Sequence, residues 1–145
     1  MPAWVCSGYE EYAKRLNKDV TIKLIEVAAS KRSKASSAEK YKTEESVRIK
    51  KVLPKGAYVV VLDVKGKQLS TEKLAMQLER WQHIGKEINL IVGGPDGLAE
   101  DILLMANESW SLSALTFPHP IVRVIVAEQV YRAWSLNNNH PYHRE

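Results

Sequence analysis

The 145-residue sequence predicts an α/β fold built on a mostly parallel sheet with helices on both faces. Short runs rich in β-branched residues, such as residues 58–64 and 88–92, alternate with longer segments of helical periodicity. Both runs are almost continuously apolar, which is typical of parallel strands that are covered on both sides. A chain of this length is expected to form one domain, residues 1–145.

The first half of the chain predicts two helices and two strands. Residues 4–16 place apolar side chains, Tyr12 among them, at helical spacing, and Lys14 and Arg15 fall on the polar side. Residues 20–27 are rich in β-branched residues and predict a strand. Residues 38–53 predict a charged helix that ends at Pro54, and a buried strand follows over residues 58–64.

The second half continues the alternation. Ser70 or Thr71 can cap a helix over residues 72–84, and Gly85 ends it. A strand over residues 88–92 then leads into a glycine loop, residues 93–97.

Three further elements follow the glycine loop. Residues 98–108 carry apolar side chains at helical spacing, and residues 112–117 predict a short extended segment. Pro120 suits the first turn of a last, long helix that runs to about Leu136.

Composition limits the class of protein. The chain is 45% hydrophobic and 26% charged, as soluble globular proteins are, and it has no apolar run of roughly 18–20 residues. The N-terminus lacks the pattern of a signal peptide. A lone Cys6 excludes an intrachain disulfide, and no Cys/His cluster has zinc spacing, so a reducing cytoplasm without a bound metal is expected. The net charge of +4 favours a polyanionic partner.

Four motifs in the last third of the chain occur in a fixed order: GGPDGL, SWSLSALTFPHP, RVIVAEQVYRAWS and NHPYHRE. With weaker matches upstream in VVVLDVKGK and LIEVAASKR, they make the chain resemble the RlmH-type 23S rRNA pseudouridine methyltransferases of the SPOUT superfamily. The resemblance implies a homodimer with a deep C-terminal trefoil knot. It also implies S-adenosylmethionine as cofactor and methylation at N3 of a pseudouridine in helix 69 of 23S rRNA, on the ribosome.

The candidate cofactor site is formed by loops that follow strands. Taken alone, the glycine loop is either a tight turn or a place where main chain without a Cβ approaches a ligand. Residues 112–117 are either a plain edge strand or an apolar slot for adenine. The resemblance favours the ligand in both cases, and it implies contacts from Leu62, Gly93, Leu112, Ser113, Ala114, Leu115, Thr116 and Phe117.

The long helix over residues 121–136 is apolar nearly all round, so it is either a central core element or a subunit interface. The resemblance favours the interface. Glu128 and Arg132 on this helix have the spacing of an i,i+4 ion pair, and Arg132 could alternatively contact substrate phosphate.

Chemistry is expected from histidines and from the C-terminal tail. His119, Tyr142 and His143 are candidates for positioning the substrate or accepting its proton, without a choice among them. The RNA-binding candidates are Lys31, Arg32, Arg132 and Arg144. A basic loop is also an ordinary solvated turn, and a polar tail is also an ordinary frayed terminus.

One departure from the family concerns the beginning of the chain. The family opens with a short apolar strand, whereas this sequence opens with the helix over residues 4–16, so that strand is expected to be absent. Its loss would leave unpaired main-chain groups. The alternative function is therefore a non-catalytic RNA- or ribosome-binding protein, and a tRNA methyltransferase of the same superfamily is a weaker one.

Overall fold

The computed structural model describes residues 2–16, 20, 25, 27, 37–93 and 97–144, with the main chain only at residues 143 and 144. The chain divides into two compact units. The helical unit comprises Met1–Leu24, Leu69–Gly85 and Phe117–Glu145, and the sheet unit comprises Ile25–Gln68 and Lys86–Thr116. The single domain over residues 1–145 stays a prediction.

The sheet unit contains a three-stranded parallel sheet with the order β2-β1-β3. The strands are β1 (Tyr58–Gln68), β2 (Ile88–Val92) and β3 (Glu108–Ser111). In the central strand, Leu62 pairs with Val92 on one side and with Trp110 on the other. The predicted α/β class and the parallel sheet are therefore confirmed, and β1 runs four residues beyond the predicted end at residue 64.

One face of this sheet carries the core of the unit. Val59 and Val61 point to that face, because strand side chains alternate, and they pack with Ile91 and Ile102. The helices α2 (Ala38–Val52) and α4 (Glu100–Met105) contribute partly buried side chains around this core. Val60 on the opposite face is also fully buried. Helices over that second face stay a prediction.

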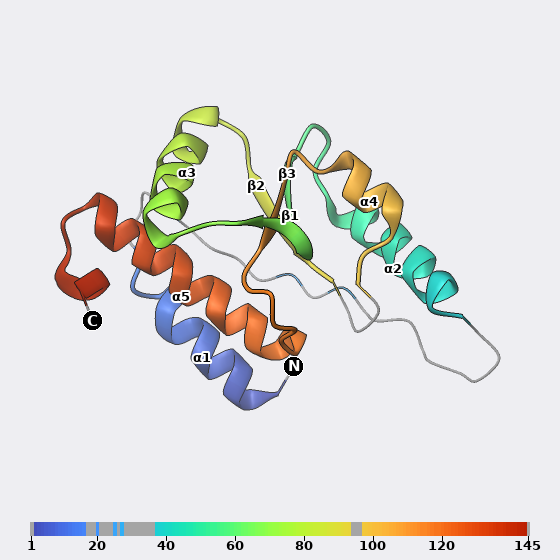
Figure 1. Cartoon of the computed structure of the whole chain (residues 1–145), viewed down its shortest axis with the longest axis horizontal. Helices are drawn as coiled ribbons and strands as arrows, with labels where there is room; N and C mark the ends of the chain where they lie inside the picture. Colours follow the sequence, from blue (N-terminus) through green and yellow to red (C-terminus); the bar gives the residue numbers. More distant parts are fainter. Residues whose placement is uncertain are drawn as a thin grey trace. The chain divides into compact units, whose positions relative to one another are not determined.

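A side-chain link joins the two helices of the sheet unit, which lie side by side in Figure 1. The hydroxyl of buried Ser46 donates to the Asp101 carboxylate at 2.8 and 2.9 Å, and the Lys50 ammonium pairs with the same carboxylate. The hydrogen bond from Lys50, with a smaller contribution from Ser46, holds the pKa of Asp101 below its usual value.

Two predictions between residues 98 and 117 are wrong. The helix α4 ends at Met105, because Asn107 turns to the sheet: its N–H donates to the Val59 carbonyl at 2.7 Å, and its side-chain oxygen accepts from the Val59 N–H at 2.8 Å. Glu108, predicted as helical, begins β3 and accepts a 2.6 Å hydrogen bond from the Tyr58 hydroxyl. Residues 112–117 are then a bent loop rather than an extended segment.

The helical unit is organised around α5. It contains α1 (Ala3–Ala13), α3 (Thr71–Ile84), α5 (His119–Asn137) and the short 3-10 helix η1 (Pro141–Arg144). Both α1 and α3 pack against α5 (Figure 1), and η1 packs against its end. Three predicted helices are confirmed here.

Local signals set the ends of these helices. The Ser70 hydroxyl accepts from the Lys73 N–H at 3.2 Å, and Gly85 ends α3 in the left-handed region with φ 73°, both as predicted. Where α1 meets α5, a Cβ added at Gly8 would lie 3.1 Å from a methyl of Val124, so the two helices approach closely.

Several predictions lie outside the described residues: most of the strand over residues 20–27, the basic loop with Lys31 and Arg32, and residues 94–96 of the glycine loop. Within the ranges that the structure does describe, no helix is long and apolar enough to cross a bilayer.

Candidate functional site

Three of the predicted cofactor segments meet at one edge of the sheet unit. The strands are parallel, so their carboxyl ends lie at the same edge. Leu62 lies in the central strand, Gly93 directly follows β2 through its neighbour Val92, and Leu112 directly follows β3. We name this edge, with the loop from Leu112 to Thr116, the carboxyl edge.

The glycine loop depends on glycine for its own packing. A Cβ added at Gly93 would lie 3.0 Å from the carbonyl carbon of Gly97 and 3.1 Å from Cγ of Leu98. Gly97 has φ 83°, a conformation that side chains rarely adopt. Gly97 and Leu98 thus leave little room for a side chain at position 93. This is a reason for a glycine there that does not involve a ligand.

A second close approach lies on the other side of the carboxyl edge. The register between β1 and β3 shifts so that both Leu62 and Lys67 pair with Trp110, which leaves a bulge of four residues between them. Gly66 lies in this bulge, and a Cβ there would be 2.5 Å from the Trp110 carbonyl carbon and 2.7 Å from its nitrogen. The bulge of β1 therefore packs closely against the main chain of Trp110, two residues before Leu112.

The loop after β3 is held by serine hydroxyls. Ser111 donates to the Ser113 carbonyl at 2.8 Å, and the Ser113 hydroxyl accepts from the Leu115 N–H at 3.0 Å. Leu112 is 38% exposed and Leu115 is 68% exposed. Apolar side chains next to main-chain polar groups form a surface suited to a flat, partly polar ligand. The other predicted residues of this segment are exposed Ala114 and Thr116 and half-buried Phe117.

A group of aromatic side chains gathers at the end of α5 in the helical unit. Its members, which we name the aromatic cluster, are Tyr12, Tyr131, Trp134, His140 and Tyr142. Tyr131 is its centre: its ring centroid lies 4.6 Å from that of Tyr142 and 5.8 Å from that of Trp134. The tail is anchored by main chain as well, since the His140 N–H donates to the Ser135 carbonyl at 2.8 Å.

Two arginines lie against this cluster. Arg132 donates to Glu128 at 2.7 Å, which confirms the i,i+4 ion pair, and its guanidinium carbon is 5.1 Å from the Tyr142 ring centroid. The Arg15 guanidinium lies over Tyr12, Tyr131 and Tyr142. Helical spacing predicts a polar face for Arg15 and contains no signal for this position over three rings.

The environment of Tyr142 fixes its protonation. Burial first, and then a hydrogen bond with Tyr12, raises the pKa of Tyr142 to about 12. Its side chain is therefore a neutral phenol throughout the physiological pH range.

The other predicted residues are spread over several elements. His119 is the first residue of α5 and is half-buried. The side chains of His143 and Arg144, like Lys31 and Arg32, lie outside the described residues. The last helix was expected to be either a core element or a subunit interface. Val122, Ala127 and Val130 are buried and α5 packs on α1 and α3 of the same chain, which supports the core alternative.

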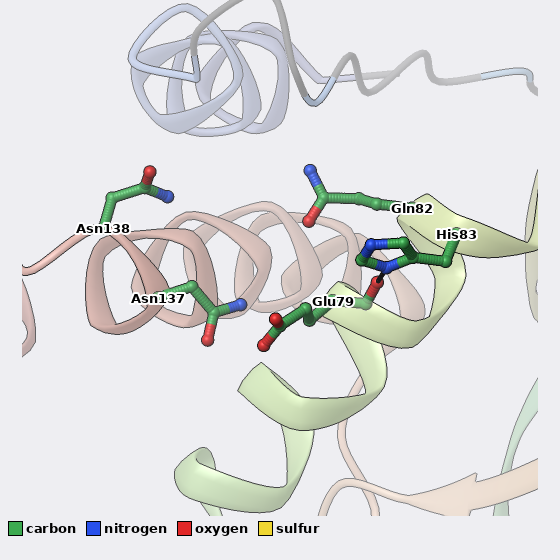
Figure 2. Close-up of a pocket in the computed structure, with 5 residues that line it drawn as sticks. All are labelled: Glu79, Gln82, His83, Asn137 and Asn138. Carbon is green, nitrogen blue, oxygen red and sulfur yellow. Dashed lines mark hydrogen bonds between the residues drawn. The ribbon is translucent and has the colours of Figure 1, made fainter.

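A polar pocket that the sequence did not predict lies where α3 and α5 end (Figure 2). It is lined by Glu79, Gln82, His83, Asn137 and Asn138. Three of these side chains contact main-chain carbonyl groups of α3 and α5. His83 Nδ1 lies 2.8 Å from the Glu79 carbonyl oxygen, Asn137 donates to the Ala75 carbonyl, and Asn138 donates to the Trp134 carbonyl. Such contacts indicate a structural role. Among the described residues, no group of His, Cys, Asp and Glu could hold a metal ion.

Comparison with known proteins agrees with the motifs. A family model described as "Predicted SPOUT methyltransferase" matches residues 1–143. The chain is also similar to "Ribosomal RNA large subunit methyltransferase H" of Hydrogenovibrio crunogenus (strain DSM 25203 / XCL-2). The two are 53% identical over 145 residues, which are 100% of this chain and 93% of the relative. With its parallel sheet and with loops gathered at the carboxyl edge, the chain belongs to the SPOUT methyltransferase family.

Proposed function

We propose that this protein transfers the methyl group of S-adenosylmethionine to N3 of a pseudouridine in helix 69 of 23S rRNA, on the ribosome. The observation that carries the proposal is the 53% identity, over the whole chain, to a protein named as a methyltransferase of large-subunit ribosomal RNA. The NHPYHRE motif at the C-terminus supports the finer choice of base and atom.

The carboxyl edge suits the cofactor. Leu62, Gly93 and the loop from Leu112 to Thr116 would hold it, with exposed Leu112 and Leu115 against the adenine and main-chain groups at its edges. When bound, S-adenosylmethionine supplies a methyl group activated by its sulfonium. The residues of this edge then have to hold the acceptor atom in line with that methyl group.

The pseudouridine N3 is an imide nitrogen, and it must lose its proton to accept the methyl group. Tyr142 is a poor acceptor for that proton, because its own pKa of about 12 keeps it protonated. We therefore assign Tyr142 to holding the RNA, by stacking or hydrogen bonding. His119 and His143 are the remaining candidates for the proton acceptor.

The aromatic cluster and its arginines suit an RNA partner. Aromatic rings stack on unpaired bases, and guanidinium groups contact both rings and phosphates. Tyr142 and Arg132 belong to this surface, and we propose Arg144, Lys31 and Arg32 as further phosphate contacts on the basis of charge and sequence position. The net charge of +4 agrees with a polyanionic substrate.

We further propose a cytoplasmic homodimer with the trefoil knot of the family. Trp4 on α1 is 57% exposed and Ile121 on α5 is 41% exposed, so apolar surface remains on these helices after α5 has packed within one chain. Sedimentation at micromolar concentration should give a dimer, and a stable monomer would contradict this part of the proposal.

The decisive experiment incubates the purified protein with tritiated S-adenosylmethionine and ribosomes whose helix 69 is unmethylated. Label should enter 23S rRNA and map to a pseudouridine of helix 69. Label at another base would refute the specificity. Binding of rRNA without measurable cofactor binding in calorimetry would instead favour the non-catalytic RNA-binding alternative.

The same assay separates the two candidate proton acceptors. We expect the variant that removes the true acceptor, His119→Gln or His143→Gln, to lose about 10²-fold in turnover, the lower end for general-base catalysis. That variant should regain activity as the pH rises, because the imide then ionises without help. Equal pH profiles for both variants and the unchanged protein would exclude both histidines from proton transfer.

A further inference from the structure

Arg15 occupies a position that connects three elements of the helical unit. It lies two residues beyond the end of α1. Its guanidinium carbon is 5.3 Å from the ring centroid of Tyr12 on α1, 5.7 Å from that of Tyr131 on α5 and 5.9 Å from that of Tyr142 on η1. All three distances are within the range of cation–π contact.

The Arg15 guanidinium is also bound by a carboxylate. Its Nη2 donates to the Glu11 carboxylate, one turn back on α1. A planar guanidinium can donate in its plane to a carboxylate and still present its faces to aromatic rings, which an ammonium cannot do. The arrangement therefore needs arginine and not merely a positive charge.

The neighbouring Lys14 provides a comparison within the same chain. Its ammonium pairs with the same Glu11 carboxylate at 3.1 Å, but its side chain is 68% exposed. Within the described residues, no aromatic ring lies under Lys14. Lys14 and Arg15 thus carry the same charge and share the same partner, and they differ in their contact with rings.

Tyr142 is also held by α5 and by the tail itself. Tyr142 packs on Tyr131 and lies beside Arg132, and its N–H donates to His140 Nδ1 at 3.2 Å. Arg15 and Tyr12 join Tyr142 to α1 and the residues just after it. The Arg15 guanidinium lies over the Tyr142 ring, and Tyr12 contacts Tyr142 through its ring, at 6.4 Å between centroids, and through a side-chain hydrogen bond. Loss of the guanidinium would leave this side of Tyr142 with the contacts from Tyr12.

From these contacts we propose that Arg15 is a positioning residue for the RNA site, where it holds Tyr142 and the C-terminal tail in the arrangement that binds substrate. The inference rests on the proposed function of the tail in RNA binding. Arg15 itself need not touch the reacting atoms. Its removal should weaken the interaction with ribosomes and leave the affinity for S-adenosylmethionine at the carboxyl edge unchanged.

The test compares Arg15→Ala, Arg15→Lys and Lys14→Ala in the full chain. We expect Arg15→Ala to raise the KM for ribosomes roughly tenfold, from the loss of contacts with three rings, with an unchanged Kd for the cofactor. Arg15→Lys should recover only a small part of this loss, since it restores charge without a planar group. Lys14→Ala, which also removes one charge, should change the KM less than about twofold.

A spectroscopic measurement reports the position of the tail directly. Ultraviolet titration of the tyrosines, assigned with Tyr142→Phe in each background, should show the pKa of Tyr142 falling from about 12 towards its ordinary value in Arg15→Lys, because the ring becomes more exposed to water while the positive charge is kept. The Lys14→Ala protein should keep the raised value.

Equal effects of Lys14→Ala and Arg15→Ala, or full activity in Arg15→Lys, would show that Arg15 acts by charge alone and would overturn the inference. An unchanged Tyr142 titration in Arg15→Lys would also overturn it. If the unaltered protein does not methylate ribosomes, the proposed function fails by itself, and the titration still decides whether Arg15 positions the tail.

Discussion

Gly66 offers a direct test of how the fold shapes the cofactor site. In Gly66→Ala, the new Cβ would lie 2.5 Å from the carbonyl carbon of Trp110. Carbon atoms pack at about 3.5 Å or more, so the main chain at Trp110 and the bulge of β1 have to separate by about 1 Å. Overpacking of this kind typically lowers the free energy of unfolding by about 1–3 kcal/mol. Leu112 follows Trp110 by two residues, so its loop should move with the strand.

The consequence for function should exceed the consequence for stability. A displacement of about 1 Å at a site that aligns reacting groups can lower the rate by roughly 10²-fold. We expect Gly66→Ala to bind S-adenosylmethionine at least about tenfold more weakly in calorimetry and to lose most of its turnover, while remaining folded at 25 °C by circular dichroism.

Gly56→Ala is the matched control. Gly56 belongs to the same unit and has φ 74°, so alanine there is strained by about 1–2 kcal/mol, but a Cβ meets no atom within 4 Å. Gly56 precedes the amino end of β1, at the opposite end of the strand from the bulge. This variant should lose stability and keep its cofactor affinity. If Gly66→Ala binds the cofactor as the unaltered protein does, the bulge does not set the geometry of the site.

Three further variants test contacts of single side chains. Asn107→Ala should lower the free energy of unfolding by about 1–3 kcal/mol in urea denaturation, because it leaves the N–H of buried Val59 without its acceptor. Asn107→Asp keeps an oxygen at this position and should unfold nearly as the unaltered protein does. Equal losses in the two variants would contradict the argument. The pKa of Asp101 is lowered, first by the hydrogen bond from Lys50, so the ionised carboxylate stabilises the fold above its ordinary pKa of 3.8, and this contribution is lost as the pH falls through the lowered value. Asp101 is half exposed, so Asp101→Asn should lower the free energy of unfolding by only about 0.5 kcal/mol. A loss that does not diminish as the pH falls below 3.8 would exclude the ion pair as its cause. The raised pKa of Tyr142 stabilises the fold below pH 10, and this contribution, at most about 2.7 kcal/mol, is lost as the pH rises from 10 to 12. Tyr142→Phe should reduce this loss of stability at alkaline pH. An unchanged loss would assign it to other groups.

Local signals in the sequence predicted most elements of the fold. The cap at Ser70, the stop at Gly85 and the apolar run of β2 each act within a few residues, so they are legible from the sequence. The third strand is different. The predicted helix includes Glu108, and no strand is predicted over residues 109–111. What makes residues 108–111 a strand is the pairing of Asn107 and Glu108 with Val59 and Tyr58, about fifty residues away. No local pattern contains that information.

The same limit explains Arg15. Helical spacing predicts that Arg15 lies on the polar side of the first helix, and it pairs there with Glu11. The rings of Tyr131 and Tyr142 come to it only because α5 and the tail fold back on α1. A sequence pattern can assign charge and periodicity to such a residue, but not the surface that a distant segment brings to it.

A glycine in a motif can have a physical cause other than the one that the motif suggests. The motif at Gly93 was interpreted through a ligand, on the argument that a Cβ would block the approach of adenosine. In the structure, a Cβ at Gly93 first meets Gly97 and Leu98 of its own loop. A bulky substitution there would therefore abolish cofactor binding whether or not the cofactor touches this residue, so Gly93→Val cannot distinguish the two causes. Gly66→Ala tests a different wall of the site, because its neighbour Trp110 belongs to another strand and the displacement passes to the loop after β3.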